Sequence, residues 1–423
     1  MKKRLATHSA DLRGASRLAI DGVLGLTHLV ESLHHNIAKR PGIFGAGVPG
    51  PTQGITGFSY RGVRWVTKLV GGSLDVALAT LVPKAGMHRV SPRREAILAA
   101  INGVLGDHLA DSSNPLALTM NFRRNGRTLA LNADALRTVF GEPTGKLLIY
   151  LHGLCMNDLQ WGPQSALGLG ETAATASPSS ASLLARDLAC TPLYLHYNTG
   201  RHISHNGRDF SMLMGELVAN WPVPVTEIVI IAHSMGGLVA RSACHDATVS
   251  TREWLPHLKK LVFLGTPHMG APLERGGNWV DMILGSSPYT APFARLGKLR
   301  SAGITDMRYS NLQDSDWKGR DRFARSPYRP QLLSLPKGVK CYAIAATTGQ
   351  RARNVTDRLL GDGLVPIDSA LGRHADANRC LALPVTHTWV AYGINHFELL
   401  HDRAVYERLR RWLAPRQTKG TVT

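Results

Sequence analysis

The segment around Ser234 combines residue types that suit nucleophilic catalysis. Residues 232–237 read AHSMGG, after an apolar run typical of a strand and before a stretch typical of a helix. A serine held on a sharp strand-to-helix turn needs small residues two positions away on either side, and the usual pattern is G-x-S-x-G. Here Ala232 replaces the first glycine, while Gly236 fits the pattern. Ser234 is a candidate nucleophile, and a serine that only caps the helix is the alternative.

A serine nucleophile requires a histidine base and a carboxylate that orients this base. Asp362 lies between two glycines in GDGLVP (361–366), which free the backbone to aim the carboxylate; a surface Asp-Gly turn is the alternative. His396 lies in NHFELL (395–400), in the loop after the last expected strand. The chain order Ser, Asp, His is the order found in doubly wound hydrolases. Ser234, Asp362 and His396 are therefore predicted to form a catalytic triad.

Other acids and histidines fit these roles less well. His387 falls inside an expected strand and His401 on an expected helix, so neither suits a base in a loop. Five aspartates lie in the insert, before the strand that should carry the acid, and are therefore weaker candidates for the acid: Asp281, Asp306, Asp314, Asp316 and Asp321.

The negative charge that develops during acyl transfer requires fixed N–H donors. One donor is expected from the residue after the nucleophile, Met235, and the other from the early loop that begins His152-Gly153, where Leu154 is the candidate. His152 is expected to orient this loop by hydrogen bonds and not to act as a second base.

The elements that must position these residues alternate between strands and helices. Asn125-Gly126 predicts a hairpin between 118–123 and 127–131. Strands are then expected at 146–151, 192–197, 227–232, 258–264, 340–346 and 384–392, with helices at 182–188, 209–221, from about 237, and 404–413. This alternation predicts an α/β fold with a mainly parallel sheet, helices on both faces and an antiparallel edge.

Three further segments flank or interrupt this domain, which is expected to span 117–413. Residues 1–116 carry helical apolar stripes, such as Val23-Leu26-Val30, and predict an accessory helical segment; amphipathic helices on a membrane surface are the alternative. The insert at about 276–330 is interpreted as a lid or acyl-binding cap, with a passive surface insert as the alternative. Residues 414–423 are expected to form a flexible tail.

Composition limits the class of protein and its surroundings. The 423 residues are 44% hydrophobic and 19% charged, enough for a sizeable core, and the formal net charge is +19. Such a charge favours an anionic partner such as a membrane surface, or is diffuse; no nucleic-acid motif accompanies it, so nucleic acid is not expected. The five cysteines show no metal-ligand spacing and are interpreted as free thiols: Cys155, Cys190, Cys244, Cys341 and Cys380. Without a signal segment or an apolar span, a cytoplasmic location is expected, with optional peripheral contact with a membrane.

Five segments together resemble the α/β-hydrolase superfamily: YLHGLCMNDLQW, IIAHSMGGLVARS, FLGTPHMGAPLER, GDGLVP and NHFELL. The resemblance is strongest to the lipase-like group related to GPI inositol-deacylases and triacylglycerol lipases, and it covers about residues 117–413. Alanine at the position of Ala232 also occurs in some lipases of this superfamily. The resemblance implies Ser234 as nucleophile, Asp362 as acid and His396 as base.

The leading hypothesis is a carboxylic-ester hydrolase that cleaves an acyl or lipid ester through an acyl-enzyme, without a metal or cofactor. An acyltransferase or thioesterase with the same triad is the alternative. A non-catalytic membrane-associated binding protein is a third hypothesis, and the intact Ser-Asp-His order argues against it.

Overall fold

The computed structural model describes residues 11, 13–17, 92–162, 178–270, 300–322, 330–349 and 361–414. By its contacts the chain divides into two units, Met1–Arg89 with Leu109–Ala117, and Val90–His108 with Leu118–Thr423. Every predicted site residue belongs to the second unit. The expected helices around Val23, residues 276–299 and 323–329 of the expected lid, and residues 415–423 of the tail lie outside the described residues. The predicted boundary at 116/117 and the lid itself stay predictions.

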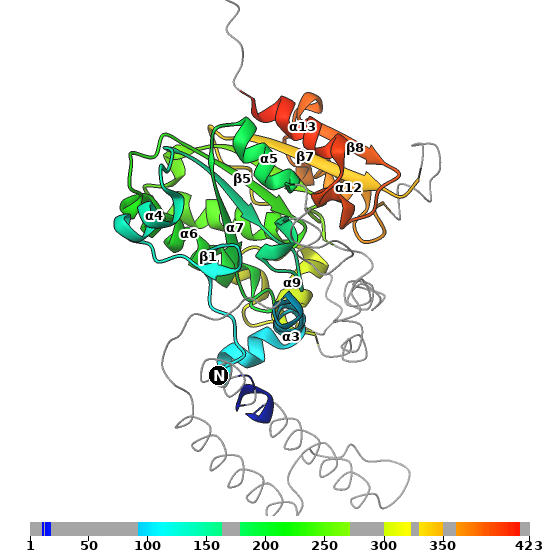
Figure 1. Cartoon of the computed structure of the whole chain (residues 1–423). Helices are drawn as coiled ribbons and strands as arrows, with labels where there is room; N and C mark the ends of the chain where they lie inside the picture. The colour runs from blue at the N-terminus through cyan, green and yellow to red at the C-terminus, as the bar shows by residue number, and fades with distance from the viewer. Residues whose placement is uncertain are drawn as a thin grey trace, which may run out of the picture. The chain divides into compact units, whose positions relative to one another are not determined.

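An eight-stranded sheet with the order β2-β1-β4-β3-β5-β6-β7-β8 organises the second unit (Figure 1). The strands β3 to β8 are parallel to one another, whereas β1 pairs antiparallel with β2 and β4. The strands are β1 (Asn121–Arg124), β2 (Arg127–Thr128), β3 (Lys146–Leu151), β4 (Thr191–His196), β5 (Glu227–His233), β6 (Leu258–Leu264), β7 (Lys340–Thr347) and β8 (Thr388–Tyr392).

Helices follow most of the strands and lie on both faces of the sheet (Figure 1). The α-helices with both ends among the described residues are α3 (Pro92–Asp111), α4 (Ala133–Phe140), α5 (Ser180–Asp187), α6 (Ile203–Asn220), α7 (Met235–Val249), α9 (Ala302–Tyr309), α10 (Asp314–Trp317), α12 (Ile367–Ala370) and α13 (Arg403–Leu413). The 3₁₀ turns are η1 (Asp158–Trp161), η3 (Leu255–His257), η6 (Ala377–Arg379), η7 (Val385–His387) and η8 (Glu398–Leu400).

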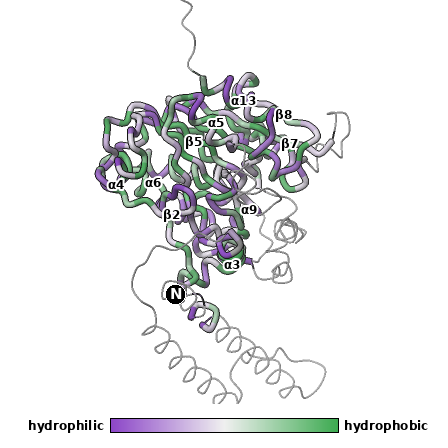
Figure 2. Tube along the Cα trace, viewed as in Figure 1, coloured by the Kyte–Doolittle hydropathy of each residue, from purple (hydrophilic) through white to green (hydrophobic). Residues whose placement is uncertain are grey.

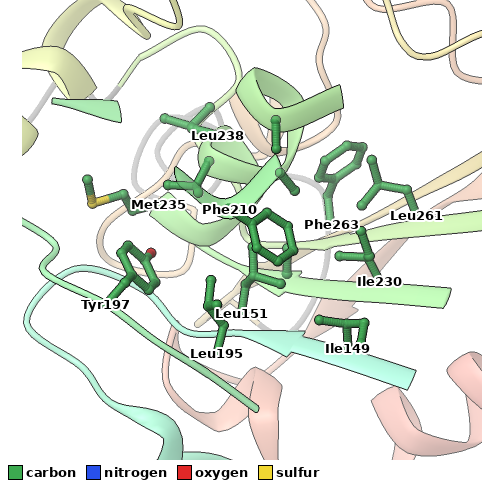
Figure 3. Close-up of a cluster of buried hydrophobic side chains, with 14 of the residues drawn as sticks. Ile149, Leu151, Leu195, Tyr197, Phe210, Ile230, Met235, Leu238, Leu261 and Phe263 are labelled. Carbon is green, nitrogen blue, oxygen red and sulfur yellow. The ribbon is translucent and has the colours of Figure 1, made fainter. Parts of the chain in front are cut away.

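The sheet separates two apolar layers because successive strand residues point to opposite faces. Ile149 and Ile230 pack with Phe210 of α6 and Leu238 of α7 on one face (Figure 3). Tyr150, the next residue along β3, packs on the other face, where α5 and α13 supply the covering side chains. In Figure 2 the tube at β5 has the colour of hydrophobic residues, in agreement with its apolar sequence. Burial on both faces explains why this strand is apolar throughout and not alternating.

The predicted fold class is confirmed, and several predicted element ends are wrong. β8 begins at Thr388 and not at 384, because Pro384 starts a 3₁₀ turn that is closed by the N–H of His387 on its carbonyl at 2.9 Å. Helix α6 begins six residues before the predicted 209, since the carboxylate of Asp306 accepts the N–H of Ile203 at 2.9 Å. That partner lies far away in the sequence, so no local pattern announces it.

The helix that was predicted to begin near 237 begins at Met235, directly after the candidate serine. Among the residues with a described position, no helix is long and apolar enough to span a membrane.

Candidate active site

Ser234 lies at the junction of β5 and α7 in a strained backbone conformation. Its φ is 54° and its ψ is −125°, in a region that residues with side chains rarely adopt. The serine is buried, and its N–H donates to the carbonyl of Leu264 in the adjacent strand at 2.8 Å. Although Ser234 occupies the N-cap position of α7, its hydroxyl makes no capping hydrogen bond. The helix-capping interpretation is therefore wrong.

The turn is tight because the first residues of α7 approach the neighbouring strands closely. A Cβ atom on Gly236 would lie 2.6 Å from the carbonyl oxygen of His152, and one on Gly237 would lie 2.0 Å from Oγ1 of Thr266. Real Cβ atoms do not approach so closely, so both positions require glycine. Ala232, in contrast, is fully buried in β5, where its small methyl group fits without a glycine.

His396 and Asp362 form a buried hydrogen-bonded pair. Nδ1 of His396 lies 2.6 Å from Oδ2 of Asp362, and both side chains are almost fully buried. The other carboxylate oxygen accepts the N–H groups of Leu364 at 3.0 Å and Val365 at 2.8 Å. A carboxylate only accepts, so Nδ1 carries the proton and Nε2 has the free lone pair. Asp362 is thus a buried orienting group and not a surface turn residue.

The structure brings this pair to the same place as Ser234. The N–H of Ser234 donates to the carbonyl of Leu264, and the next residue in the chain is Gly265. Gly265 packs against His396, since a Cβ atom on this glycine would lie only 3.0 Å from Cε1 of the imidazole. The residue before the serine, His233, is 3.0 Å from the backbone carbonyl of His396 through its Nε2 atom. Nε2 of His396 is buried and has no hydrogen-bond partner among the described residues. The oriented imidazole of His396 therefore lies against Gly265, and its backbone contacts His233, the residue before the strained serine.

The loop after β3 presents free backbone N–H groups next to the serine. A Cβ atom on Gly153 would lie 2.9 Å from Cβ of Ser234, which leaves no room for a side chain there. The N–H of Cys155 donates to Thr199 Oγ1 at 3.2 Å, and that of Met156 donates to the carbonyl of Gly153 at 3.3 Å.

Within the described part of the chain, the N–H groups of Gly153, Leu154 and Met235 have no such partner. Leu154 and Met235 were the predicted donors. Both residues are buried, and the N–H of Met235 also lies at the positive end of α7. This geometry suits the stabilisation of a negatively charged oxygen.

His152 lies behind this loop, in an environment that keeps it neutral. Its Nδ1 is 3.0 Å from the carbonyl of Gly153, and its ring stacks on Tyr197 at a centroid distance of 4.4 Å. The Tyr197 hydroxyl donates to the backbone carbonyl of His152 at 2.8 Å. Complete burial lowers the pKa of His152 to about 3. His152 therefore contacts the loop at Gly153, and its role in orienting the loop stays a prediction.

Three contacts of this site were missed at the sequence level: those of His233, Tyr197 and Gly265. His233 fixes the backbone of His396, and burial holds the pKa of His233 well below its usual value. Its position directly before the serine was a signal that could have been used. Tyr197 and Gly265 carry no such signal, since each acts only through a residue far away in the chain.

The other candidate acids and histidines lie elsewhere or have other partners. Asp306 is buried in α9, where it lies 2.9 Å from Nδ1 of His202, and burial raises its pKa. Asp314 and Asp316 belong to α10, and neither contacts His396. His387 ends the turn η7, and His401 lies between η8 and α13, so neither occupies the predicted element. In the ranges with described coordinates, no group of three or more histidine, cysteine or acidic side chains could hold a metal ion.

Three features together are those of the α/β-hydrolase fold: a mainly parallel sheet, a strained serine between a strand and a helix, and an acid and a histidine after later strands. A family model described as a domain of unknown function, DUF7379, matches residues 193–303. No curated protein matches the chain.

Solved structures of lipases and esterases are similar at low identity. The mature lipase BlEst2 of Bacillus licheniformis is 12% identical with a TM-score of 0.42, over 65% of this chain and 95% of that chain. A hyperthermophilic esterase from the archaeon Pyrobaculum calidifontis is 14% identical with a TM-score of 0.35, over 64% of this chain and 72% of that chain. Phospholipase PlaB from Legionella pneumophila, in complex with thio-NAD, is 14% identical with a TM-score of 0.32, over 53% of this chain and 44% of that chain.

Proposed function

We propose that this protein is a serine carboxylic-ester hydrolase that acts on acyl or lipid esters. The observation that carries the proposal is the oriented pair of His396 and Asp362, which contacts His233, the residue before a serine in a strained conformation, while Nε2 of His396 has no partner among the described residues. A serine held in this conformation, next to a base with a buried carboxylate partner, is the arrangement that acyl transfer requires. The acyl or lipid nature of the ester rests on the sequence resemblance alone.

In the proposed mechanism, Oγ of Ser234 attacks the ester carbonyl while Nε2 of His396 takes its proton. The carbonyl oxygen becomes an oxyanion and accepts hydrogen bonds from the N–H groups of Leu154 and Met235. His396 then gives the proton to the alcohol, which leaves, and the acyl group stays on Ser234. Water attacks the acyl-enzyme with His396 again as the base; the bond between the acyl group and Oγ of Ser234 then breaks, the carboxylic acid leaves, and His396 returns the proton to Oγ. Asp362 keeps the imidazole in the required tautomer throughout.

Labelling with a fluorophosphonate probe tests the nucleophile. The wild-type protein is expected to gain one probe adduct at Ser234 and to hydrolyse p-nitrophenyl esters, whereas S234A should do neither. Ser250, exposed just after the other end of α7, offers a matched control, and S250A should label like the wild type. A wild type that does not label, or an S234A variant that labels equally, overturns the proposal. The same assay with an added alcohol measures acyl transfer against hydrolysis.

A further inference from the structure

Helix α3 packs directly against the loop that carries Leu154. A Cβ atom on Gly103 would lie 2.1 Å from Sγ and 3.1 Å from Cα of Cys155, the residue after Leu154. Cys155 has a φ of 57°, a conformation that a residue with a side chain adopts only when its surroundings impose it. The absence of a side chain at Gly103 therefore sets how far the helix and the loop can approach each other.

The helix is also tied to the residues that hold the loop from the other side. The Asn198 side chain donates to the carbonyl of Gly106 at 2.8 Å, and the next residue, Thr199, accepts the N–H of Cys155. The Ser301 hydroxyl donates to the carbonyl of Gly103 at 2.6 Å. Both glycines thus face neighbours that use the backbone of the helix as a hydrogen-bond acceptor.

A buried ion-pair network joins α3 to the end of the same loop. NH1 of Arg123 in β1 lies 2.6 Å from Glu95 of α3 and 3.3 Å from Asp158, the first residue of η1. Nδ1 of His196 lies 3.3 Å from the same carboxylate oxygen of Asp158. The side chains of Glu95, Arg123 and Asp158 are 7%, 13% and 2% exposed, so the pairs are shielded from water. Shielded pairs tolerate little change in geometry, because a lost partner leaves a buried charge uncompensated.

We propose that α3 is a positioning element of the active site, with Gly103 and Glu95 as positioning residues for the N–H of Leu154. The inference rests on the proposed function, in which this N–H binds the oxyanion. A donor stabilises the transition state only if it is held in place before the charge develops. Gly103 fixes the loop at Cys155 by steric contact, and Glu95 fixes it at Asp158 through Arg123. The helix that was predicted to be part of an accessory segment thereby positions the loop of the candidate active site.

Kinetics of the G103A variant test the steric contact. The new methyl group must displace Cys155, so kcat for a p-nitrophenyl ester should fall by about tenfold or more while KM stays within about twofold, because the donor acts on the transition state. Gly215 of α6 has open space around its Cα, and G215A is the matched control, expected to keep the wild-type kcat. If the G103A variant retains kcat within about twofold of the control, the positioning role is wrong.

A second readout does not depend on activity. The thiol of Cys155 is buried, and burial raises its pKa to about 12, so it should react slowly with an alkylating reagent. Displacement of the loop in G103A should raise alkylation of Cys155 by about tenfold or more. Cys244, buried in α7, is the internal reference and should stay protected, since unfolding would expose both thiols. Unchanged alkylation of Cys155 overturns the inference.

The E95Q variant tests the ionic contact without a change in side-chain shape. It should lower kcat by several-fold at constant KM, and an unchanged kcat would remove Glu95 from the positioning role.

The two proposals fail differently. A wild type that neither labels nor hydrolyses esters overturns the proposed function, whereas an active wild type with unaffected G103A and E95Q variants overturns only the role of α3.

Discussion

At the scale of single residues, the hydrogen bond between Nδ1 of His396 and the carboxylate of Asp362 determines which imidazole nitrogen can take a proton. The carboxylate is itself oriented by two backbone N–H groups, those of Leu364 and Val365. Because all these atoms are buried, water does not compete for the pairing. The imidazole therefore has one tautomer and one orientation before a substrate arrives.

Replacing this carboxylate with an amide should impair catalysis without preventing folding. In D362N the amide keeps the size of the side chain but no longer favours the required tautomer, so kcat should fall by about 10³- to 10⁴-fold with little change in KM. Steady-state kinetics and the rate of fluorophosphonate labelling measure the effect. Asp134, exposed in the first turn of α4, provides the control variant D134N. A kcat for D362N within tenfold of the D134N value would contradict the role of Asp362.

At the scale of elements, the junction of β5 and α7 explains how an alanine replaces the first glycine of the nucleophile motif. The close approaches occur at Gly236 and Gly237, after the serine, whereas Ala232 lies within the strand. A glycine at a strand interior would bring only additional backbone freedom in the unfolded chain.

Two substitutions at Ala232 test this explanation. A232G restores the usual motif and should leave kcat nearly unchanged, while it lowers the free energy of unfolding by about 0.5–1 kcal/mol. A232V adds two methyl groups to a fully buried position and should lower that free energy by about 1–3 kcal/mol, together with kcat. Urea denaturation and ester kinetics measure both effects. A large gain in kcat for A232G would mean that alanine impairs the turn.

The elements were predictable where a local pattern decides them. The strand 258–264 was predicted with the observed ends, and its buried apolar residues 261–264 lead directly into the turn at Gly265. The start of α6 was not predictable, since it depends on Asp306 a hundred residues away. The start of β8 depends on the competition between a 3₁₀ turn and a strand at Pro384, which the apolar pattern does not show.

At the scale of the whole molecule, several histidines are buried in neutral form. Burial lowers the pKa of His152 to about 3 and the pKa values of His233 and His268 well below the ordinary value of 6.5. In the unfolded chain these side chains take up protons below about pH 6.5, whereas the folded chain excludes those protons. The unfolded state then binds more protons, so stability is fully present above this pH and is lost as the pH falls.

Acidification should therefore destabilise the protein in a range that is mild for most proteins. Below about pH 6.5, each of the three histidines should lower the free energy of unfolding by up to about 1.4 kcal/mol per pH unit. Urea denaturation at about pH 7.5 and about pH 5.5 measures this loss. H268N should reduce the dependence on pH, whereas H374N, which changes an exposed residue, should not. A free energy of unfolding that stays constant over this range would contradict the prediction.

The net charge of +19 is a property of the whole chain, and it is the reason for expecting an anionic partner. Contact with an anionic membrane, a cytoplasmic location and the role of residues 1–116 stay predictions. By its contacts the segment Val90–His108 belongs to the second unit, so at least this part of the N-terminal region is grouped with the unit that carries the candidate site.

The sequence by itself determined the fold class and proposed three side chains and two N–H donors for one site. It could do so because periodicity specifies strands and helices, and because parallel strands bring the ends of distant segments to one edge of the sheet. Only the tertiary structure showed that His233, Tyr197 and Gly265 support these groups, and that α3 packs against the Leu154 loop. Those contacts depend on the close approach of chain segments that share no local pattern, and packing alone decides them.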